Sequence, residues 1–274
     1  MSDLHEQVLD DLRKSGFPLE IQVGSRFSNK GWTVRHQAIS RGEGEPKPGY
    51  VDVLAMKLIT RNFEKFARLN FTVVCECKKS ETHPWVFYAP QRADFLMREV
   101  APFTLIKTVS EPPIQITDGS PLSRTRYLIG DPLGNLAQSS HLAFWDERQK
   151  GREGYNQINV AINQVVSATQ HQIRVLSGIV KLTPGVLIVA CPLIVLDGPM
   201  FEYNLALDGE PNLKRISNIK YLASTIGQER EVKLPNNQTT TMIPTEHFLV
   251  DIISKDSLDQ YIGWLEEDMR LIMT

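Results

Sequence analysis

The chain has 274 residues, a formal net charge of -2 and a hydrophobic content of 42%, which is typical of a globular protein with one large domain. It has no basic tail, so a nucleic-acid partner would need local positive charge and help from a metal ion in neutralising phosphates. The N-terminus lacks a signal peptide, and the longest apolar run, 186–196, is too short to span a bilayer. We therefore expect a cytoplasmic protein with no membrane partner.

The first third of the chain predicts a helix followed by several strands. Apolar spacing and Gly/Pro content predict, in order, a helix over 4–15, a strand or irregular segment over 21–27, a strand over 31–38, a loop over 41–49, and strands over 50–56 and 73–79. The residues between the last two strands connect them, so we expect neighbouring parts of one meander.

The rest of the chain predicts an insertion and then a helix, strands and a final helix. The expected elements are a loop-rich insertion over 81–150 with segments at 85–88 and 91–99, a helix over 155–177, strands over 186–196, 201–207, 216–223 and 247–253, and a helix that begins near Ser257 with a capping-box pattern. We find no internal repeat and no interdomain linker, which predicts a single domain over 1–274.

The three cysteines, Cys75, Cys77 and Cys191, all lie in apolar, strand-like runs. Their odd number and the absence of a C-x-x-C pair argue against a disulfide framework and against a zinc site. We interpret them as buried thiols.

The segment 73–79 carries an acid and an amine in an otherwise apolar strand. Residues two apart on a strand point to the same face, so Glu76 and Lys78 project together. The preceding apolar strand adds the carboxylate of Asp52. Two carboxylates can hold a hard cation such as Mg2+, and an ammonium can stabilise a phosphate. An ordinary cross-face ion pair is the alternative interpretation, since Glu-x-Lys also occurs at 45–47 and 231–233.

The order helix, strand, Asp strand, Glu-x-Lys strand, helix, strand resembles the PD-(D/E)XK nuclease superfamily, which has the restriction-endonuclease-like fold. Asp52, Glu76 and Lys78 match its motif, and residues 4–80 carry the resemblance best. Two departures are the lack of a proline before Asp52 and the roughly seventy-residue insertion before the core helix. The resemblance implies an α/β protein with a central mixed sheet flanked by helices.

The same resemblance implies roles for the site residues. Asp52 and Glu76 would bind one or two Mg2+ ions, which Mn2+ can replace, with the Cys77 backbone carbonyl as a further ligand. Lys78 would orient the attacking water or stabilise charge on the phosphoryl oxygens. Hydrolysis would leave a phosphate and a hydroxyl.

Three further residues are candidates for the site. Glu6 lies on the opening helix, where this family often has a glutamate near the site, but Glu6 also fits a helix cap with Asp3. Gln37 could contact phosphate from the strand before the motif. Gln164 belongs to an amide-rich helix face that could approach phosphates or bases without repulsion, or could simply be solvated.

The resulting hypothesis is a metal-dependent endonuclease acting on nucleic acid, with DNA ahead of RNA. A homodimer, a protein activator and a role in defence or restriction are expected by analogy with the family alone. One alternative is a non-catalytic nucleic-acid-binding or assembly module that keeps the fold. Another is a different Mg2+-dependent phosphoryl enzyme acting on nucleotides, although the chain has no P-loop.

Overall fold

The computed structural model describes thirteen stretches of the chain, which together hold both terminal helices and the central sheet. They are residues 4–40, 49–60, 68–80, 82–88, 106–108, 136–137, 139–142, 157–180, 186–205, 209–226, 230–233, 239–242 and 245–273. The segment 91–99, predicted as a helix, and most of the expected loop at 41–49 lie outside these residues. No helix in the described stretches is long and apolar enough to cross a membrane.

Two helices open the chain. The expected helix is confirmed as α1 (Leu4–Lys14), and it is followed by α2 (Phe17–Asn29). The interpretation of 21–27 as a strand or irregular segment is therefore wrong. Leu19, Val23 and Phe27 recur every four residues and form the buried stripe of α2, and Pro18 stands in its first turn, where a proline is tolerated.

The expected meander is the first half of the main sheet. It consists of β1 (Thr33–Ser40), β2 (Gly49–Thr60) and β3 (Arg68–Lys79), each antiparallel to the next. Helix α5 (Gln157–Val180) then leads into β8 (Val186–Asp197), which runs parallel to β3 over twelve paired residues. β8 reads as an unbroken apolar run because both of its faces are covered.

The rest of the sheet consists of two strands from the last third of the chain and two short strands from the region 81–150. The strand order of the whole sheet is β1-β2-β3-β8-β14-β11-β6, and β5 pairs with the other end of β8. The added strands are β14 (Thr245–Ser254), β11 (Asn218–Ile226), β6 (Leu136–Ala137) and β5 (Ile106–Thr108). The result is an α/β architecture with a mixed sheet, as the sequence predicts.

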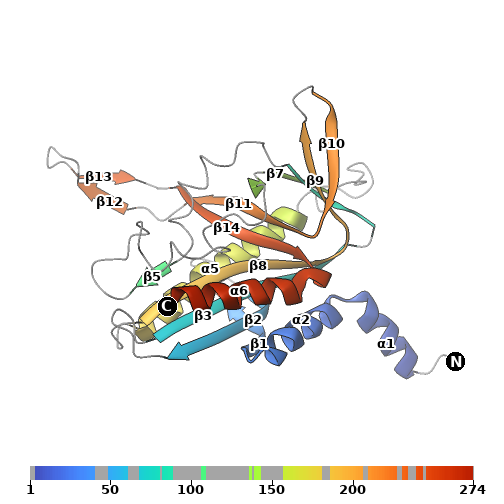
Figure 1. Cartoon of the computed structure of the whole chain (residues 1–274), viewed down its shortest axis with the longest axis horizontal. Coiled ribbons are helices and arrows are strands. Elements are labelled where there is room, and N and C mark those ends of the chain that lie inside the picture. Colours follow the sequence, from blue (N-terminus) through green and yellow to red (C-terminus); the bar gives the residue numbers. More distant parts are fainter. Residues whose placement is uncertain are drawn as a thin grey trace.

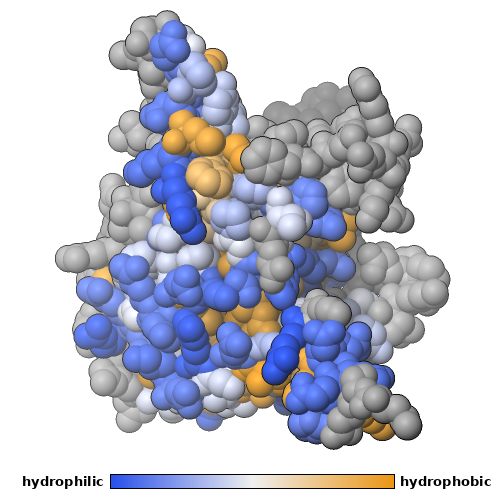
Figure 2. Space-filling model, turned by 90° about the vertical axis from the view of Figure 1, so that its right-hand side faces the viewer, coloured by the Kyte–Doolittle hydropathy of each residue, from blue (hydrophilic) through white to orange (hydrophobic). Residues whose placement is uncertain are grey.

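Two smaller sheets accompany the main one. The first has the order β10-β9-β4-β7 and the second pairs β12 with β13. Their strands are β4 (Trp85–Tyr88), β7 (Ser139–Leu142), β9 (Met200–Leu205), β10 (Pro211–Ile216), β12 (Arg230–Lys233) and β13 (Thr239–Met242). The hairpin of β9 and β10 projects from the body of the molecule (Figures 1 and 2). The region 81–150 thus contains strands, not loops alone.

The C-terminal helix is confirmed, but its expected cap is not. The turn η4 (Lys255–Ser257) leads into α6 (Leu258–Ile272), and Ser257 makes no side-chain capping bond. Its hydroxyl lies 3.0 Å from that of Ser254 instead. The hydrogen bond with Ser254 thus takes the place of the capping-box contact.

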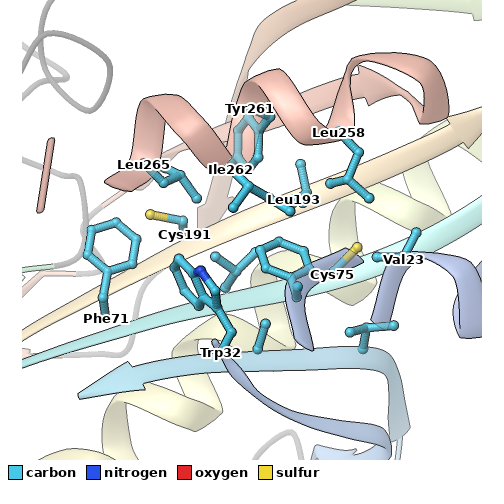
Figure 3. Close-up of a cluster of buried hydrophobic side chains, with 14 of the residues drawn as sticks. Val23, Trp32, Phe71, Cys75, Cys191, Leu193, Leu258, Tyr261, Ile262 and Leu265 are labelled. Carbon is cyan, nitrogen blue, oxygen red and sulfur yellow. The ribbon is translucent and has the colours of Figure 1, made fainter. Parts of the chain in front are cut away.

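Helices cover both faces of the main sheet (Figure 1). Helices α2 and α6 lie over one face and α5 over the other, and each face has its own hydrophobic cluster. The α2/α6 cluster includes Leu19, Val23, Phe27, Trp32, Val53, Phe71, Cys75, Cys77, Cys191, Leu193, Tyr261, Ile262 and Leu265; Figure 3 shows part of it. The α5 cluster includes Val51, Leu54, Val74, Trp85, Phe87, Ile158, Ile162, Val165, Ile194 and Ile252. The cysteines are free and buried, as predicted.

A buried ion pair joins β11 to β14 inside the sheet. Lys220 donates to Asp251 Oδ1 at 2.7 Å, and the Tyr261 hydroxyl donates to Asp251 Oδ2 at 3.0 Å. Both side chains of the pair are less than 10% exposed. Because each oxygen of Asp251 has a partner, the carboxylate is stabilised without solvent.

Gly198 is a close-packing position that a single methyl group would disturb. A Cβ there would overlap the backbone carbonyl oxygen of Ser80, directly after the Glu76–Lys79 segment. We predict that Gly198→Ala lowers the free energy of unfolding by roughly 1–3 kcal/mol, measured by urea denaturation.

The matched control is Gly263→Ala on the exposed side of α6, where an added Cβ meets nothing within 4 Å. This change should raise stability by about 0.5–1 kcal/mol, because alanine is the better helix former. Equal effects of the two substitutions would contradict the packing argument.

Candidate functional site

The candidate site lies where β2 and β3 stop pairing. Their ladder runs from Thr60↔Arg68 to Val53↔Cys75. At the next position a side chain replaces the backbone as the hydrogen-bond acceptor: Asp52 Oδ2 accepts the backbone N–H of Cys77 at 2.7 Å. A side chain thus satisfies an amide that has lost its place in the β2–β3 ladder. The structure thereby brings Asp52 to the Glu76–Lys78 segment, as the sequence predicts.

The backbone around Asp52 changes face. Val53 belongs to the α2/α6 cluster, whereas Val51 on the same strand belongs to the α5 cluster. Residues two apart on a regular strand share a face, so β2 turns over at Asp52. Opposite this point on β1, Gln37 has a φ of 47° although the pairs on either side keep one register. The two strands therefore place Asp52 at the boundary between the two cores.

Glu76 is a buried carboxylate with only one of its oxygens paired. Its side chain is 3% exposed, and Oε2 accepts from Lys78 Nζ at 2.9 Å. Oε1 is buried and has no hydrogen-bond partner in the part of the chain that the structure describes. The pKa of Glu76 is raised to about 7, mainly by burial and then by repulsion from Asp52. The attraction of Lys78 opposes this increase. Glu76 therefore exchanges its proton near neutral pH.

Lys78 keeps its charge although it is largely buried. Burial opposes the charge, but the attraction of Glu76 and its hydrogen bond outweigh this, so the pKa of Lys78 is raised. Nζ also donates to Gln164 Oε1 of α5 at 3.4 Å. Two of the three ammonium N–H groups are thus directed by the protein. The structure brings Gln164 to the site, as the sequence suggests.

A third carboxylate at the site, Glu20, is not among the residues expected from the sequence. It lies on α2, and its Oε2 is buried and has no hydrogen-bond partner among the described residues. The pKa of Glu20 is raised, first by burial and then by repulsion from Asp52. The attraction of Lys78 lowers it by less. The apolar stripe Leu19, Val23 and Phe27 is the sequence signal that would have placed Glu20 on a core-packed helix.

The other expected site residues lie in different surroundings. Glu6 is exposed in the first turn of α1, the helix farthest from the sheet in Figure 1. The side chain of Gln37 is exposed beside Asp52. The Cys77 thiol points into the α2/α6 cluster, where its hydrogen bond with Cys75, and then burial, raise its pKa well above the ordinary value. The thiol therefore stays protonated, and the predicted role of the Cys77 carbonyl stays a prediction.

The acidic residues fit a hard cation in chemistry but do not form a closed cage. Among the described residues, no group of three or more His, Cys, Asp and Glu side chains is arranged to hold a metal ion. Glu20 and Glu76 nevertheless each present one buried, unpaired carboxylate oxygen. Carboxylate oxygens are the ligands that Mg2+ prefers, and Mg2+ keeps several waters when one or two carboxylates bind it. The donor set therefore fits a hydrated divalent cation.

No protein-family model, curated protein or solved structure matches this chain.

The buried carboxyl group predicts a pH-dependent stability. The pKa of Glu76 is about 7 in the folded protein and 4.5 ordinarily. Folding therefore favours the protonated carboxyl group, and the stability that the protein has below pH 4.5 decreases as the pH rises through 7. We predict that Glu76→Gln gains stability relative to wild type over this range, by up to about 3 kcal/mol at pH 8. Urea denaturation at pH 4.5 and pH 8 would measure the difference.

The control for this experiment is Glu6→Gln, which removes an exposed carboxylate from α1. It should give the same pH dependence as the wild type. A Glu76→Gln variant whose stability relative to wild type is unchanged between the two pH values would contradict the burial argument.

Proposed function

We propose that this chain hydrolyses phosphodiester bonds in nucleic acid with a divalent metal ion, with DNA as the preferred substrate. The observation that carries the proposal is the convergence of Asp52, Glu76 and Lys78 at one end of the meander, where Glu76 and the nearby Glu20 each have one unpaired carboxylate oxygen among the described residues. Buried and half-satisfied carboxylates cost stability, and they are retained where chemistry uses them.

The order of the elements supports the same proposal. Helix α1, the meander β1–β3, helix α5 and the parallel strand β8 follow one another in the order that the resemblance to PD-(D/E)XK nucleases implies, with α2 as an additional helix after α1. The insertion falls between β3 and α5. A fold alone supports no activity, so the argument rests on the site residues, and the topology explains how they are brought together.

The carboxylates have the role of holding the cation. Asp52 and Glu76 would bind it, with Glu20 contributing from α2. When bound, a divalent ion supplies charge stabilisation for the phosphoryl oxygens and a water of lowered pKa. Glu76 must lose its proton to bind a metal, and its pKa of about 7 means that it does so near neutral pH.

Lys78 has the role of positioning charge at the reacting phosphate. Glu76 and Gln164 hold its ammonium from two sides, which leaves a third N–H for a phosphoryl oxygen or for the attacking water. Water attacks phosphorus, the P–O bond to the leaving group breaks, and the products are a phosphate end and a hydroxyl end. A fixed donor of this kind contributes about 10²–10³ in rate.

A second candidate function is nucleic-acid binding without hydrolysis. It is favoured by the absence of a closed three-ligand group among the described residues and by the pairing of Glu76 with Lys78. A binding module would use the same site to hold a phosphate through Lys78. The two functions differ in whether a bond is cut when metal is supplied.

Cleavage of plasmid, duplex and single-stranded DNA, and of RNA, tests the proposal in Mg2+, Mn2+ or EDTA. We predict metal-dependent cutting by the wild type and a loss of at least about 100-fold in Asp52→Asn and in Lys78→Met. The matched control is Lys233→Met, since Glu231 and Lys233 form a second Glu-x-Lys on the separate hairpin β12–β13. Metal-dependent binding without cutting would favour the binding module, and cutting in EDTA would overturn the proposed chemistry.

Glu20 gives a test that does not depend on activity. We predict that Glu20→Gln weakens Mn2+ binding about tenfold, because it removes an unpaired carboxylate oxygen next to Asp52. Calorimetric titration of the protein with Mn2+ would measure it, with Glu6→Gln as the control. Equal affinities for the wild type and Glu20→Gln would remove Glu20 from the site.

A further inference from the structure

Two open pockets lie along helix α5, and the first of them includes Lys78 of the candidate site. The first has a volume of about 430 Å³ and is lined by Lys78, Lys79, Trp85, Gln157, Val160 and Gln164. Its polar groups are ammonium and amide groups. Trp85 lines this pocket, and its indole N–H is buried with no hydrogen-bond partner among the described residues. This pocket therefore offers donors to an anionic or base-like ligand.

The second pocket has a volume of about 690 Å³ and lies between α5 and the strands β1 and β2. Apolar side chains form most of its walls: Leu54, Met56, Val175 and Leu176. Arg35, His171 and Gln172 supply polar groups. The His36 ring also borders it but packs closely against Gly24 of α2. An apolar wall with a cationic edge suits a flat ring that carries a phosphate.

One side of α5 connects the two pockets. The pocket residues Gln157, Val160, Gln164, His171 and Val175 follow the three-, four- and seven-residue spacing that keeps side chains on one side of a helix. The stretch from 157 to 175 spans about 27 Å at 1.5 Å per residue. No Asp or Glu occurs in α5, and none of the described residues that line the two pockets is acidic. This side of α5 thus presents no repulsion to a phosphate backbone.

The candidate site adjoins both pockets, because Lys78 lines the first and Asp52 lies near a residue of the second. Gln164 lines the first pocket and also accepts from Lys78. Leu54 lines the second pocket and is two residues from Asp52 on β2. A chain that runs along α5 from one pocket to the other therefore crosses the residues assigned to hydrolysis.

We propose that the substrate is a single-stranded segment of nucleic acid, laid along α5 with an unpaired nucleotide in each pocket and the scissile phosphate between them. This inference rests on the proposed function for the position of the scissile bond. Apolar walls can contact a base only when its faces are unstacked, which a duplex does not allow. Duplex binding depends on a broad positively charged surface, and a chain with a net charge of -2 has little excess positive charge to form one.

Binding without cleavage tests the inference. The probe is a short, mixed-sequence DNA oligonucleotide labelled with a fluorophore, as a single strand and as a duplex, in EDTA and in Ca2+, with fluorescence anisotropy as readout. We expect the single strand to bind at least about tenfold more tightly than the duplex. Val175→Glu, at a half-exposed position of the second pocket, should weaken single-strand binding by at least about tenfold through repulsion and lost stacking.

The matched control is Asn159→Glu, which adds the same charge to an exposed position on the other side of α5. It should change single-strand binding less than twofold, and urea denaturation should show both variants folded. Equal binding of duplex and single strand, or equal weakening by the two variants, would overturn the inference.

The cleavage assay separates this result from the proposed function. In one outcome, the wild type binds single strands, Val175→Glu loses this binding, and the wild type cuts no substrate with Mg2+. This outcome would support the inference and overturn the hydrolytic function. In the opposite outcome, the wild type and Val175→Glu cut duplex DNA equally well. This outcome would support the hydrolytic function and overturn the inference.

Discussion

The burial of one carboxylate, that of Glu76, is the constraint on which the site depends. Glu76 stands near the end of β3, a strand covered on both faces, and its side chain is almost fully removed from water. A carboxylate in that position must be paired or protonated. Lys78 pairs one oxygen, and Asp52 is near enough to oppose a second negative charge. The protonation of Glu76 and the orientation of Lys78 both follow from this burial.

A second buried carboxylate in the same sheet shows what a fully satisfied acid looks like. Both oxygens of Asp251 are hydrogen-bonded, one to Lys220 and one to Tyr261. Glu76 has a comparable burial but leaves Oε1 without a partner. The pair at Asp251 can be read as structural, because nothing about Asp251 calls for a ligand. The unpaired oxygen of Glu76, like that of Glu20, is a cost that a bound cation would offset.

The layers of the fold decide which residues reach this end of the sheet. Helix α2 packs in the α2/α6 cluster and brings Glu20, whereas α5 packs on the opposite face and brings Gln164. The two layers meet at the site because β2 changes face at Asp52, opposite the positive φ of Gln37. Strain of this kind is kept at positions that the surrounding structure holds in place. The same helix α5 then continues past the second pocket, which links the site to a surface for a longer ligand.

The sequence by itself determined what short-range geometry controls. Alternation along a strand placed Glu76 and Lys78 on one face, and helical spacing predicted α1, α5 and α6, because both patterns depend only on residues close in the chain. The meander and the buried thiols followed in the same way. Only the tertiary structure decided that Glu20, on a helix that the sequence analysis did not predict, lies near Asp52 and Lys78 while Glu6 stays exposed on α1. It also decided that Gln164 meets Lys78 across 86 positions of sequence. These contacts depend on how α2 and α5 pack on opposite faces of the sheet, and packing between distant segments has no periodic signal in the chain.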